Sequence, residues 1–268
     1  MALNTSDQPI HSIVQGNGPP VILLHGIGAS SLGWSALIPD LVAAGYRAYA
    51  PDLPGHGESF KPQRPESYHV QNIYQALVDW IQSLALPDLP VLIGHSLGGY
   101  LSLQYSLDYP ERLRALVLVN PFYTPGQLFP IVRWLRGRAD AGSRALERIS
   151  APLLERASEW NPTVSKQLSR EFRRQMAADL FRASPLILNI LPSISDLTPR
   201  LAEVATQAGV IWGSRDLTLS PASFPALIER LPNSVGYHIP GGRHQPHMSR
   251  PEMVNAYILT FLGSLGKP

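Results

Sequence analysis

The stretch VLIGHSLGGYL, residues 91–101, places one serine where a short apolar run stops and a helical pattern begins. Gly94 lies two residues before Ser96, and Gly98 lies two residues after it. A sharp turn from a strand into a helix strains the residue at its tip, and crowding leaves room only for small residues on either side. The spacing therefore predicts either an ordinary tight turn or a serine that is held out for chemistry.

Short apolar runs alternate with helical patterns over most of the chain. The expected strands are an edge strand at 11–16, a buried strand at 21–26, and further strands at 46–52, 90–95, 113–120, 207–213 and 234–239. The expected helices lie at 34–45, 69–86, 97–108, 221–231 and from 251 onward. Because strands that alternate with helices form right-handed βαβ units, we predict an α/β fold with a mostly parallel central sheet flanked by helices.

One long segment interrupts this alternation. Residues 122–200 contain helical patterns broken by prolines, and no stretch there has the pattern of a strand. An excursion between two strands of a parallel sheet lies over their carboxyl ends, where the ligands of α/β proteins bind. We therefore predict a core formed by residues 1–121 and 201–268, and a helical lid formed by residues 122–200.

Composition limits the class of protein. The chain has 268 residues, of which 44% are hydrophobic and 16% charged, so it can bury a large core. Its net charge of +2 is too small to indicate a nucleic-acid partner. There is no cysteine, which excludes disulfides and a thiolate nucleophile. We see no secretory signal and no apolar run of membrane-spanning length, and we expect a cytoplasmic protein.

Ser96 needs a base to become a nucleophile, and the base needs an acid to orient it. Asp216 lies just past an expected strand that ends in Trp-Gly, and His244 lies just past the last expected strand. All three residues therefore stand at carboxyl ends of strands. The amides of Ile27, in the turn after the first buried strand, and of Leu97 could together form an oxyanion hole.

Five motifs together resemble the α/β-hydrolase fold superfamily: HGIG at 25–28, DLPGHGES at 52–59, GHSLGG at 94–99, WGSRD at 212–216 and HQPHMSRPE at 244–252. The resemblance covers about 1–121 and 203–268 and implies a lidded, esterase-like serine hydrolase. It implies Ser96 as nucleophile, His244 as general base and then acid, and Asp216 as the residue that orients it. It also implies no need for a metal or an organic cofactor.

Several other residues compete for these roles. Some relatives carry the acid after the strand before the lid, where this chain has the uncharged Asn120, and this favours Asp216. His247 is expected to be a hydrogen-bonded residue at a helix start, and His95 to point to the opposite face of the strand from Ser96. We expect structural roles in turns for His25, Asp52 and His56.

Two positions depart from the pattern of the superfamily. Arg243 stands where a glycine usually precedes the histidine, and Ser249 stands where glutamate is common. Arg243 places a permanent cation next to the base. The sequence leaves three interpretations open: an electrostatic effect on the base, a contact with an anionic substrate, or a side chain that points into solvent.

The expected lid is basic. It holds 11 Arg and Lys166 against seven Asp and Glu, a net charge of 12 − 7 = +5, and the stretch LFPIVRWLRGR at 128–138 mixes apolar residues with arginines. This favours a lid helix with its apolar side over the pocket and its arginines in water, and less strongly a helix that touches anionic lipid or an acidic substrate. Phe122, Tyr123 and Trp134 are the predicted pocket-lining residues.

These observations predict a monomeric or homodimeric serine hydrolase that cleaves a small-molecule carboxylic ester through an acyl-enzyme. A thioesterase, a lactonase, a C–C bond hydrolase or an acyltransferase would use the same three residues. A ligand-sensing receptor with slow turnover, and a binding module whose triad does not work, are alternatives from other classes.

Overall fold

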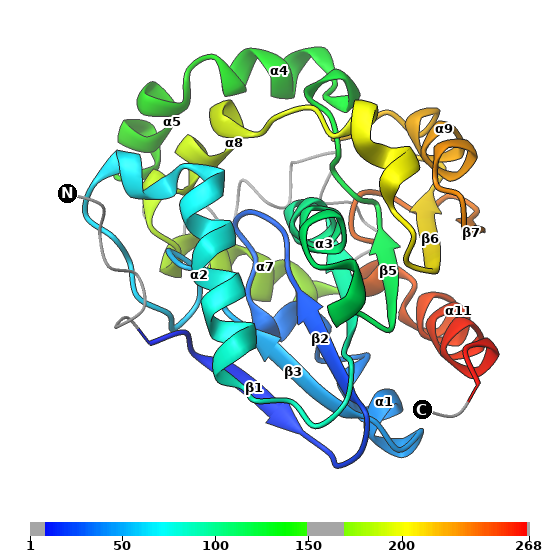
Figure 1. Cartoon of the computed structure of the whole chain (residues 1–268). Helices are drawn as coiled ribbons and strands as arrows, with labels where there is room; N and C mark the ends of the chain where they lie inside the picture. The colour runs from blue at the N-terminus through cyan, green and yellow to red at the C-terminus, as the bar shows by residue number, and fades with distance from the viewer. Residues whose placement is uncertain (1–8, 149–168, 267–268) are drawn as a thin grey trace.

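Seven strands form a single sheet in the computed structural model, which describes residues 9–148 and 169–266 (Figure 1). The strand order is β1-β3-β2-β4-β5-β6-β7. β1 pairs antiparallel with β3, and the other five pairings are parallel. The strands are β1 (Ser12–Gln15), β2 (Pro20–Leu24), β3 (Arg47–Pro51), β4 (Val91–His95), β5 (Ala115–Val119), β6 (Ala208–Gly213) and β7 (Ser234–Ile239). The predicted fold class, including the edge position of β1, is confirmed.

Helices cover both faces of the sheet. Successive side chains of a strand point to opposite faces, so Leu92 of β4 joins the apolar cluster on one side and Ile93 joins the cluster on the other. The first cluster includes residues of α2, α3 and α9, and the second includes residues of α1 and α11. The core helices are α1 (Ile38–Ala43), α2 (Val70–Ser83), α3 (Leu97–Asp108), α9 (Ser223–Arg230), α10 (Pro246–Ser249) and α11 (Pro251–Ser264).

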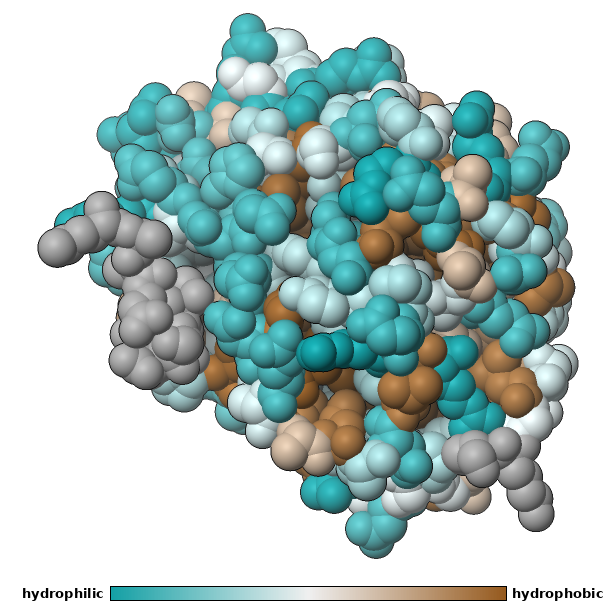
Figure 2. Space-filling view, in the orientation of Figure 1, coloured by the Kyte–Doolittle hydropathy of each residue, from teal (hydrophilic) through white to brown (hydrophobic). Residues whose placement is uncertain are grey.

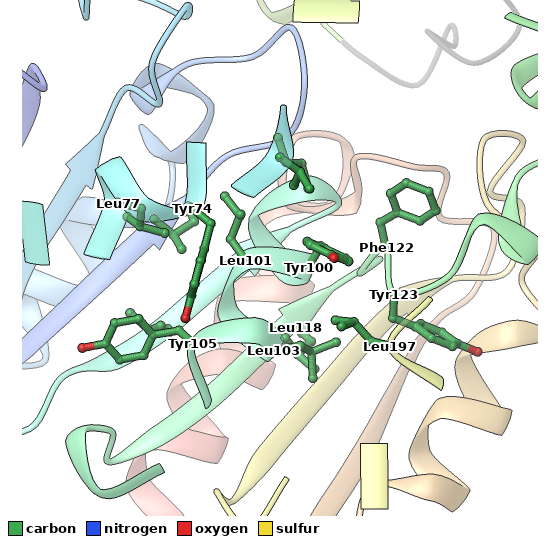
Figure 3. Close-up of a cluster of buried hydrophobic side chains, with 14 of the residues drawn as sticks. Tyr74, Leu77, Tyr100, Leu101, Leu103, Tyr105, Leu118, Phe122, Tyr123 and Leu197 are labelled. Atoms are coloured by element: carbon green, nitrogen blue, oxygen red, sulfur yellow. The ribbon is translucent and has the colours of Figure 1, made fainter. Parts of the chain in front are cut away.

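α2 shows how the helical pattern produces this packing. Its apolar residues recur every three or four positions, so one stripe of the helix is buried. Figure 3 shows Tyr74 and Leu77 of α2 beside Leu101 and Tyr105 of α3. The helix begins after His69, whose side chain accepts a hydrogen bond from the Gln71 N–H. It therefore lies within the predicted range 69–86 and is slightly shorter.

The helix predicted at 34–45 is wrong at its start. The structure has a 3₁₀ turn at Ser31–Trp34, and α1 begins only at Ile38. Pro39 explains the difference, because proline lacks an N–H and fits only in the first turn of a helix. The end is as expected, since Gly45 follows the helix with φ +85°.

Among the described residues, four α-helices lie between β5 and β6: α4 (Pro130–Arg136), α5 (Ala139–Leu146), α7 (Arg170–Arg182) and α8 (Ile190–Ser193). They fall within the segment 122–200, which we call the insertion, and α4, α5 and α8 lie beyond the carboxyl ends of the strands (Figure 1). Residues 149–168 of the predicted lid, and the ends 1–8 and 267–268 of the predicted core, lie outside the described residues. The two-part division and the action of the insertion as a lid remain predictions.

Gln127 holds the start of the insertion in place. Its side chain is buried, and its Nε2 donates to the carbonyl of Pro121 at 3.1 Å and to Ser223 Oγ at 3.0 Å. Its Oε1 accepts from the N–H groups of Tyr123, at 2.7 Å, and of Thr124, at 3.1 Å. One amide side chain therefore satisfies four polar groups where the chain leaves β5.

The face of the molecule seen in Figure 1 is mostly hydrophilic, with apolar atoms in small, separated patches (Figure 2). Within the described ranges, no helix combines the length and the apolar character that crossing a bilayer requires.

Candidate active site

Ser96 occupies the sharp turn between β4 and α3. Its backbone has φ +51° and ψ −111°, a strained conformation for a residue other than glycine. A Cβ on Gly94 would lie 2.3 Å from the Gly98 carbonyl oxygen, and a Cβ on Gly98 would lie 2.1 Å from that of Leu24. The two glycines are therefore required by close backbone approaches, as the spacing in the sequence predicts.

The structure brings Ser96, His244 and Asp216 together. His244 Nε2 lies 3.1 Å from Ser96 Oγ, and His244 Nδ1 lies 2.7 Å from Asp216 Oδ2. Because a carboxylate accepts, Nδ1 carries the hydrogen, and Nε2 is free to accept the serine proton. The geometry is that of a nucleophile joined to a base, with the base oriented by an acid.

Asp216 is buried but remains ionised. Burial alone would raise the pKa of its carboxyl. Interaction with His244 and hydrogen bonds from His244, Asn120 and the Leu219 N–H outweigh burial and hold this pKa below its ordinary value. Asp216 Oδ1 accepts from the N–H groups of Thr218, at 2.7 Å, and of Leu219, at 2.9 Å. The carboxylate is therefore fixed on both oxygens.

Asn120 is a partner of Asp216 that sequence reasoning missed. Its Nδ2 donates to Asp216 Oδ2 at 2.7 Å, and its Oδ1 accepts from the Gly213 N–H at 3.2 Å. The residue follows β5 with φ +40°, a conformation that asparagine tolerates better than most residues. Its position directly after a strand, in the row of strand ends that holds Ser96, was the available signal in the sequence.

The predicted oxyanion amides flank Ser96. Leu97 begins α3, whose amino end carries a partial positive charge. Ile27 follows Gly26, where a Cβ would lie 3.2 Å from Ser96 Cβ, so the turn after β2 touches the serine. Among the described residues, neither the Ile27 N–H nor the Leu97 N–H has a hydrogen-bond acceptor. Their joint action as an oxyanion hole remains a prediction.

His95 supports the loop that carries His244. Its Nε2 lies 2.8 Å from the His244 carbonyl oxygen, and since that oxygen can only accept, Nε2 is the donor. Burial, followed by the neighbouring His247 and His244, lowers the pKa of His95 well below its usual range. His95 is therefore neutral, and its structural role agrees with the expectation from the sequence.

The expectation for His247 is wrong in one respect. The residue lies in the first turn of a helix as predicted, in α10, but its Nδ1 is buried and has no hydrogen-bond partner in the described structure. Its ring instead packs against those of Trp34, with centroids 4.6 Å apart, and His95, at 4.5 Å. Burial lowers the pKa of His247 to about 3, so a neutral ring fills this space.

His25, Asp52 and His56 have the structural surroundings expected of them. His25 Nδ1 donates to the Gly26 carbonyl at 2.8 Å, and its Nε2 accepts from the Leu53 N–H at 2.9 Å. The Asp52 carboxylate accepts from the N–H groups of Ser31 and Glu58. His56 is fully buried, and the centroid of its ring lies 5.0 Å from that of the His25 ring.

The three predicted pocket residues lie in different surroundings. The Phe122 N–H donates to the Ser96 carbonyl at 3.0 Å, which places Phe122 next to the serine. The Tyr123 hydroxyl donates to the Ser223 carbonyl at 2.9 Å, and Figure 3 shows the two rings extending in different directions. Trp134 is 51% exposed, and Arg138 lies 4.2 Å from its ring centroid. Substrate contact by these residues remains a prediction.

The arginines of the site and the insertion do not all lie in water. Arg243 has two buried guanidinium nitrogens, Nε and Nη1, without a hydrogen-bond partner within the described ranges, so the solvent-pointing interpretation is wrong for these atoms. Arg133 Nη2 donates to the carbonyls of Gly126 and Leu128, and Arg136 binds the carbonyl of Leu191. These two side chains hold the insertion together.

Among residues 9–148 and 169–266, no three histidine, aspartate or glutamate side chains are grouped to hold a metal ion.

Comparison with known proteins places these motifs in context. The sequence model of the alpha/beta hydrolase fold matches residues 19–251. A pimeloyl-[acyl-carrier protein] methyl ester esterase of Aeromonas hydrophila subsp. hydrophila is 30% identical over 256 residues, 92% of this chain and 97% of that protein. A bifunctional epoxide hydrolase 2 of Sus scrofa is 38% identical over 116 residues, which span 43% of this chain and only 21% of that protein.

A solved structure shares the fold over nearly its whole length. An esterase from Thermogutta terrifontis superposes with a TM-score of 0.80, covering 96% of this chain and 94% of that chain. The two sequences are 24% identical, so the likeness concerns the fold.

Proposed function

This chain belongs to the α/β-hydrolase fold family, and on that premise we propose that it is a serine hydrolase that cleaves a carboxylic ester through an acyl-enzyme. One observation carries the proposal: a continuous line of hydrogen bonds runs from Asp216 through His244 to Ser96. The serine also stands at a strained turn between two required glycines.

The reaction begins at the serine hydroxyl. Ser96 Oγ attacks the ester carbonyl carbon, its proton passes to His244 Nε2, and the carbonyl oxygen becomes an oxyanion that the Ile27 and Leu97 N–H groups bind. The carbon–alkoxy bond then breaks, and the departing alcohol takes the proton from Nε2. Water attacks the acyl-enzyme and gives a proton to Nε2. That proton returns to Ser96 Oγ as the carboxylic acid leaves.

Asp216 acts through the imidazole. Its carboxylate accepts from His244 Nδ1 at 2.7 Å, which fixes the ring with Nε2 toward Ser96. The negative charge, kept by the lowered pKa of Asp216, stabilises the imidazolium that forms in each half-reaction. Asn120 holds the same carboxylate from the other side.

The nucleophile separates this chain from some relatives. Epoxide hydrolases and haloalkane dehalogenases of the superfamily resemble it but carry an aspartate nucleophile, whereas this chain has Ser96. A serine acyl-enzyme is an ester that water can hydrolyse at its carbonyl carbon. The full-length match to a methyl ester esterase also supports an ester as substrate.

A fluorophosphonate probe tests the proposal. Wild type should be labelled at Ser96 and should hydrolyse short p-nitrophenyl esters. Ser96→Ala should lose the label and about 10⁴–10⁶ in kcat. Ser106→Ala, which removes another buried hydroxyl of α3, is the matched control and should keep both. A folded wild type without label or turnover would overturn the proposal.

The same assay separates the alternatives. Label with negligible turnover across esters of varied chain length would favour a ligand-sensing receptor. Transfer of the acyl group to an added alcohol or thiol in preference to water would favour an acyltransferase. Turnover of thioesters, lactones or C–C substrates above that of esters would move the proposal to those reactions on the same residues.

A further inference from the structure

Asp179 is a buried carboxylate that the proposed mechanism does not use. It lies on α7 of the insertion and is 2% exposed. Its Oδ1 accepts from Ser30 Oγ at 2.9 Å and from Gln175 Nε2 at 2.7 Å. Gln175 belongs to the same helix, but Ser30 belongs to the core. The carboxylate therefore joins the insertion to the core.

Ser30 lies in the turn that carries a predicted oxyanion amide. We call residues 25–31, from the end of β2 to the first residue of the following 3₁₀ turn, the oxyanion loop. Within it the Ala29 N–H donates to the Gly26 carbonyl at 3.2 Å, so Ile27 lies inside a closed turn. Ser30 Oγ also accepts from the Leu32 N–H at 3.2 Å. A bond that fixes Ser30 therefore fixes one end of this turn.

α7 also packs directly on the loop. Gly28 has φ +74°, and a Cβ there would lie 3.1 Å from Leu180 Cδ1. On the other side, the Ser31 N–H donates to Asp52 Oδ1 at 2.7 Å. The loop is thus held between two buried carboxylates, Asp52 of the core and Asp179 of the insertion.

We propose that Asp179 is a positioning residue of this site: through Ser30 it fixes the oxyanion loop when α7 is docked, and so sets the direction of the Ile27 N–H. The inference rests on the proposed function. It adds that full activity also requires α7 of the insertion to be docked on the core. A misplaced donor costs rate because oxyanion stabilisation depends on distances of about 2.7–3.1 Å. The effect should therefore fall on kcat.

The charge on Asp179 makes the contact sensitive to pH. Burial raises the pKa of Asp179 from its ordinary 3.8 to about 6, against the lowering effects of the Ser30 and Gln175 hydrogen bonds. Asp52 across the interface raises it further, and Arg182 of α7 lowers it. Between pH 3.8 and 6 the folded state binds more protons than the unfolded chain. The docked state therefore weakens as pH rises through this window and is constant above it.

Three variants test the inference in the full-length protein at pH 7. Ser30→Ala and Asp179→Ala should each lower kcat for a p-nitrophenyl ester by about 10- to 100-fold, with KM changed less than about 3-fold, because a donor out of line affects the transition state. The kcat of the double variant should fall no further than that of either single variant, because each substitution already breaks the same contact. Asp179→Asn keeps an acceptor oxygen and should restore kcat to within about 3-fold of wild type.

Glu58→Gln is the matched control. It weakens a 3.7 Å contact between Arg182 and Glu58, which also joins α7 to the core but is exposed, and it leaves Arg182 in place, so kcat should stay unchanged. As a second readout, urea unfolding should show wild type weakening relative to Asp179→Asn as pH rises from about 4 to 6.

The outcomes separate this inference from the proposed function. Wild type without fluorophosphonate label at Ser96 would overturn both. A labelled, active wild type whose folded Ser30→Ala and Asp179→Ala variants keep kcat would overturn the positioning role alone. Equal losses in kcat for Asp179→Asn and Asp179→Ala would also overturn it, since the acceptor oxygen would then not matter.

Discussion

At the scale of single residues, Asn120 helps to keep the Asp216 carboxyl ionised. Its Nδ2 donates to the same oxygen of Asp216 that binds His244. An aspartate at this position would tolerate the positive φ and fill the same space, but it would set a second carboxylate against the first. Two adjacent carboxylates cannot both ionise freely, so one of them takes up a proton at higher pH.

We therefore expect Asn120→Asp to move the acid limb of the kcat/KM profile to higher pH and to lower the free energy of unfolding by about 1–3 kcal/mol. The pH–rate profile and urea unfolding at pH 7 measure the two effects. Asn72→Asp, at an exposed position on α2, is the control and should change neither. An unchanged acid limb in the folded Asn120→Asp variant would contradict this view of Asp216.

The sequence predicted which residues meet at the strand ends, but it missed hydrogen-bond partners whose contact no local pattern announces. The meeting of Ser96, Asp216 and His244 could be predicted because each lies at or shortly after the carboxyl end of a parallel strand, and such ends meet at one edge of a sheet. Asn120 also follows a strand, but nothing in the sequence pairs it with Asp216. The contact of Asp179 could not be predicted either, because its partner Ser30 lies 149 residues away and no local pattern links an aspartate inside a helix to a serine in a turn.

At the scale of elements, the start of the insertion depends on one side chain. Gln127 binds four polar groups between β5 and α9, so its removal leaves two N–H groups, a carbonyl and a hydroxyl with fewer partners. Each buried polar group left unsatisfied costs about 1–3 kcal/mol, and local relaxation recovers part of the loss.

Gln127→Ala should therefore lower the free energy of unfolding by about 2–4 kcal/mol. Gln127→Glu keeps the acceptor oxygen but loses the amide donor, and it should lie between wild type and Gln127→Ala. Urea denaturation of the purified variants measures both, with Gln75→Ala on the exposed side of α2 as the control. A loss for Gln127→Ala no greater than that of the control would argue against this anchoring role.

Element boundaries were predictable where burial dictates the pattern. The central strands β2, β4 and β5 are buried on both faces, and α2 has one apolar stripe, so their positions differ from prediction by only a few residues. α1 was predicted too long because Pro39 was not weighed against the apolar pattern. The boundaries of the helices within the insertion could not be predicted from the sequence, since these helices are short and prolines separate them.

At the scale of the whole molecule, four histidines are buried in neutral form. Burial lowers the pKa of His25 and His95 and brings the pKa of His56 and His247 to about 3. The unfolded chain binds protons at these residues below about pH 6.5, while the folded chain does not. Stability is therefore complete above pH 6.5 and is lost as pH falls from there toward 3.

We expect each such histidine to contribute a slope of about 1.4 kcal/mol per pH unit below 6.5, opposed in part by Asp179. Urea unfolding at pH 7, 6 and 5 measures the total slope. His247→Phe keeps an aromatic ring beside Trp34 and should reduce the slope by about one such increment, whereas His69→Gln at an exposed position should not. If the pH slope of stability were the same in His247→Phe and wild type, the His247 ring would take up its proton as readily in the folded as in the unfolded protein.

The fold of the whole molecule could be predicted from the alternation of strands and helices, because segments in that order form a parallel sheet with helices packed on its faces. The substrate of the proposed reaction does not follow in the same way. We expect it to depend on the insertion, whose side chains meet the core through contacts such as Asp179–Ser30 that only the folded chain creates.

The long interval between Ser96 and His244, 148 residues, has a consequence for biosynthesis. His244 lies beyond β7, so a chain still being made on the ribosome carries Ser96 before it has the imidazole that the proposed mechanism requires. On the proposed mechanism, the nascent chain therefore has no activated serine until residue 244 has been translated.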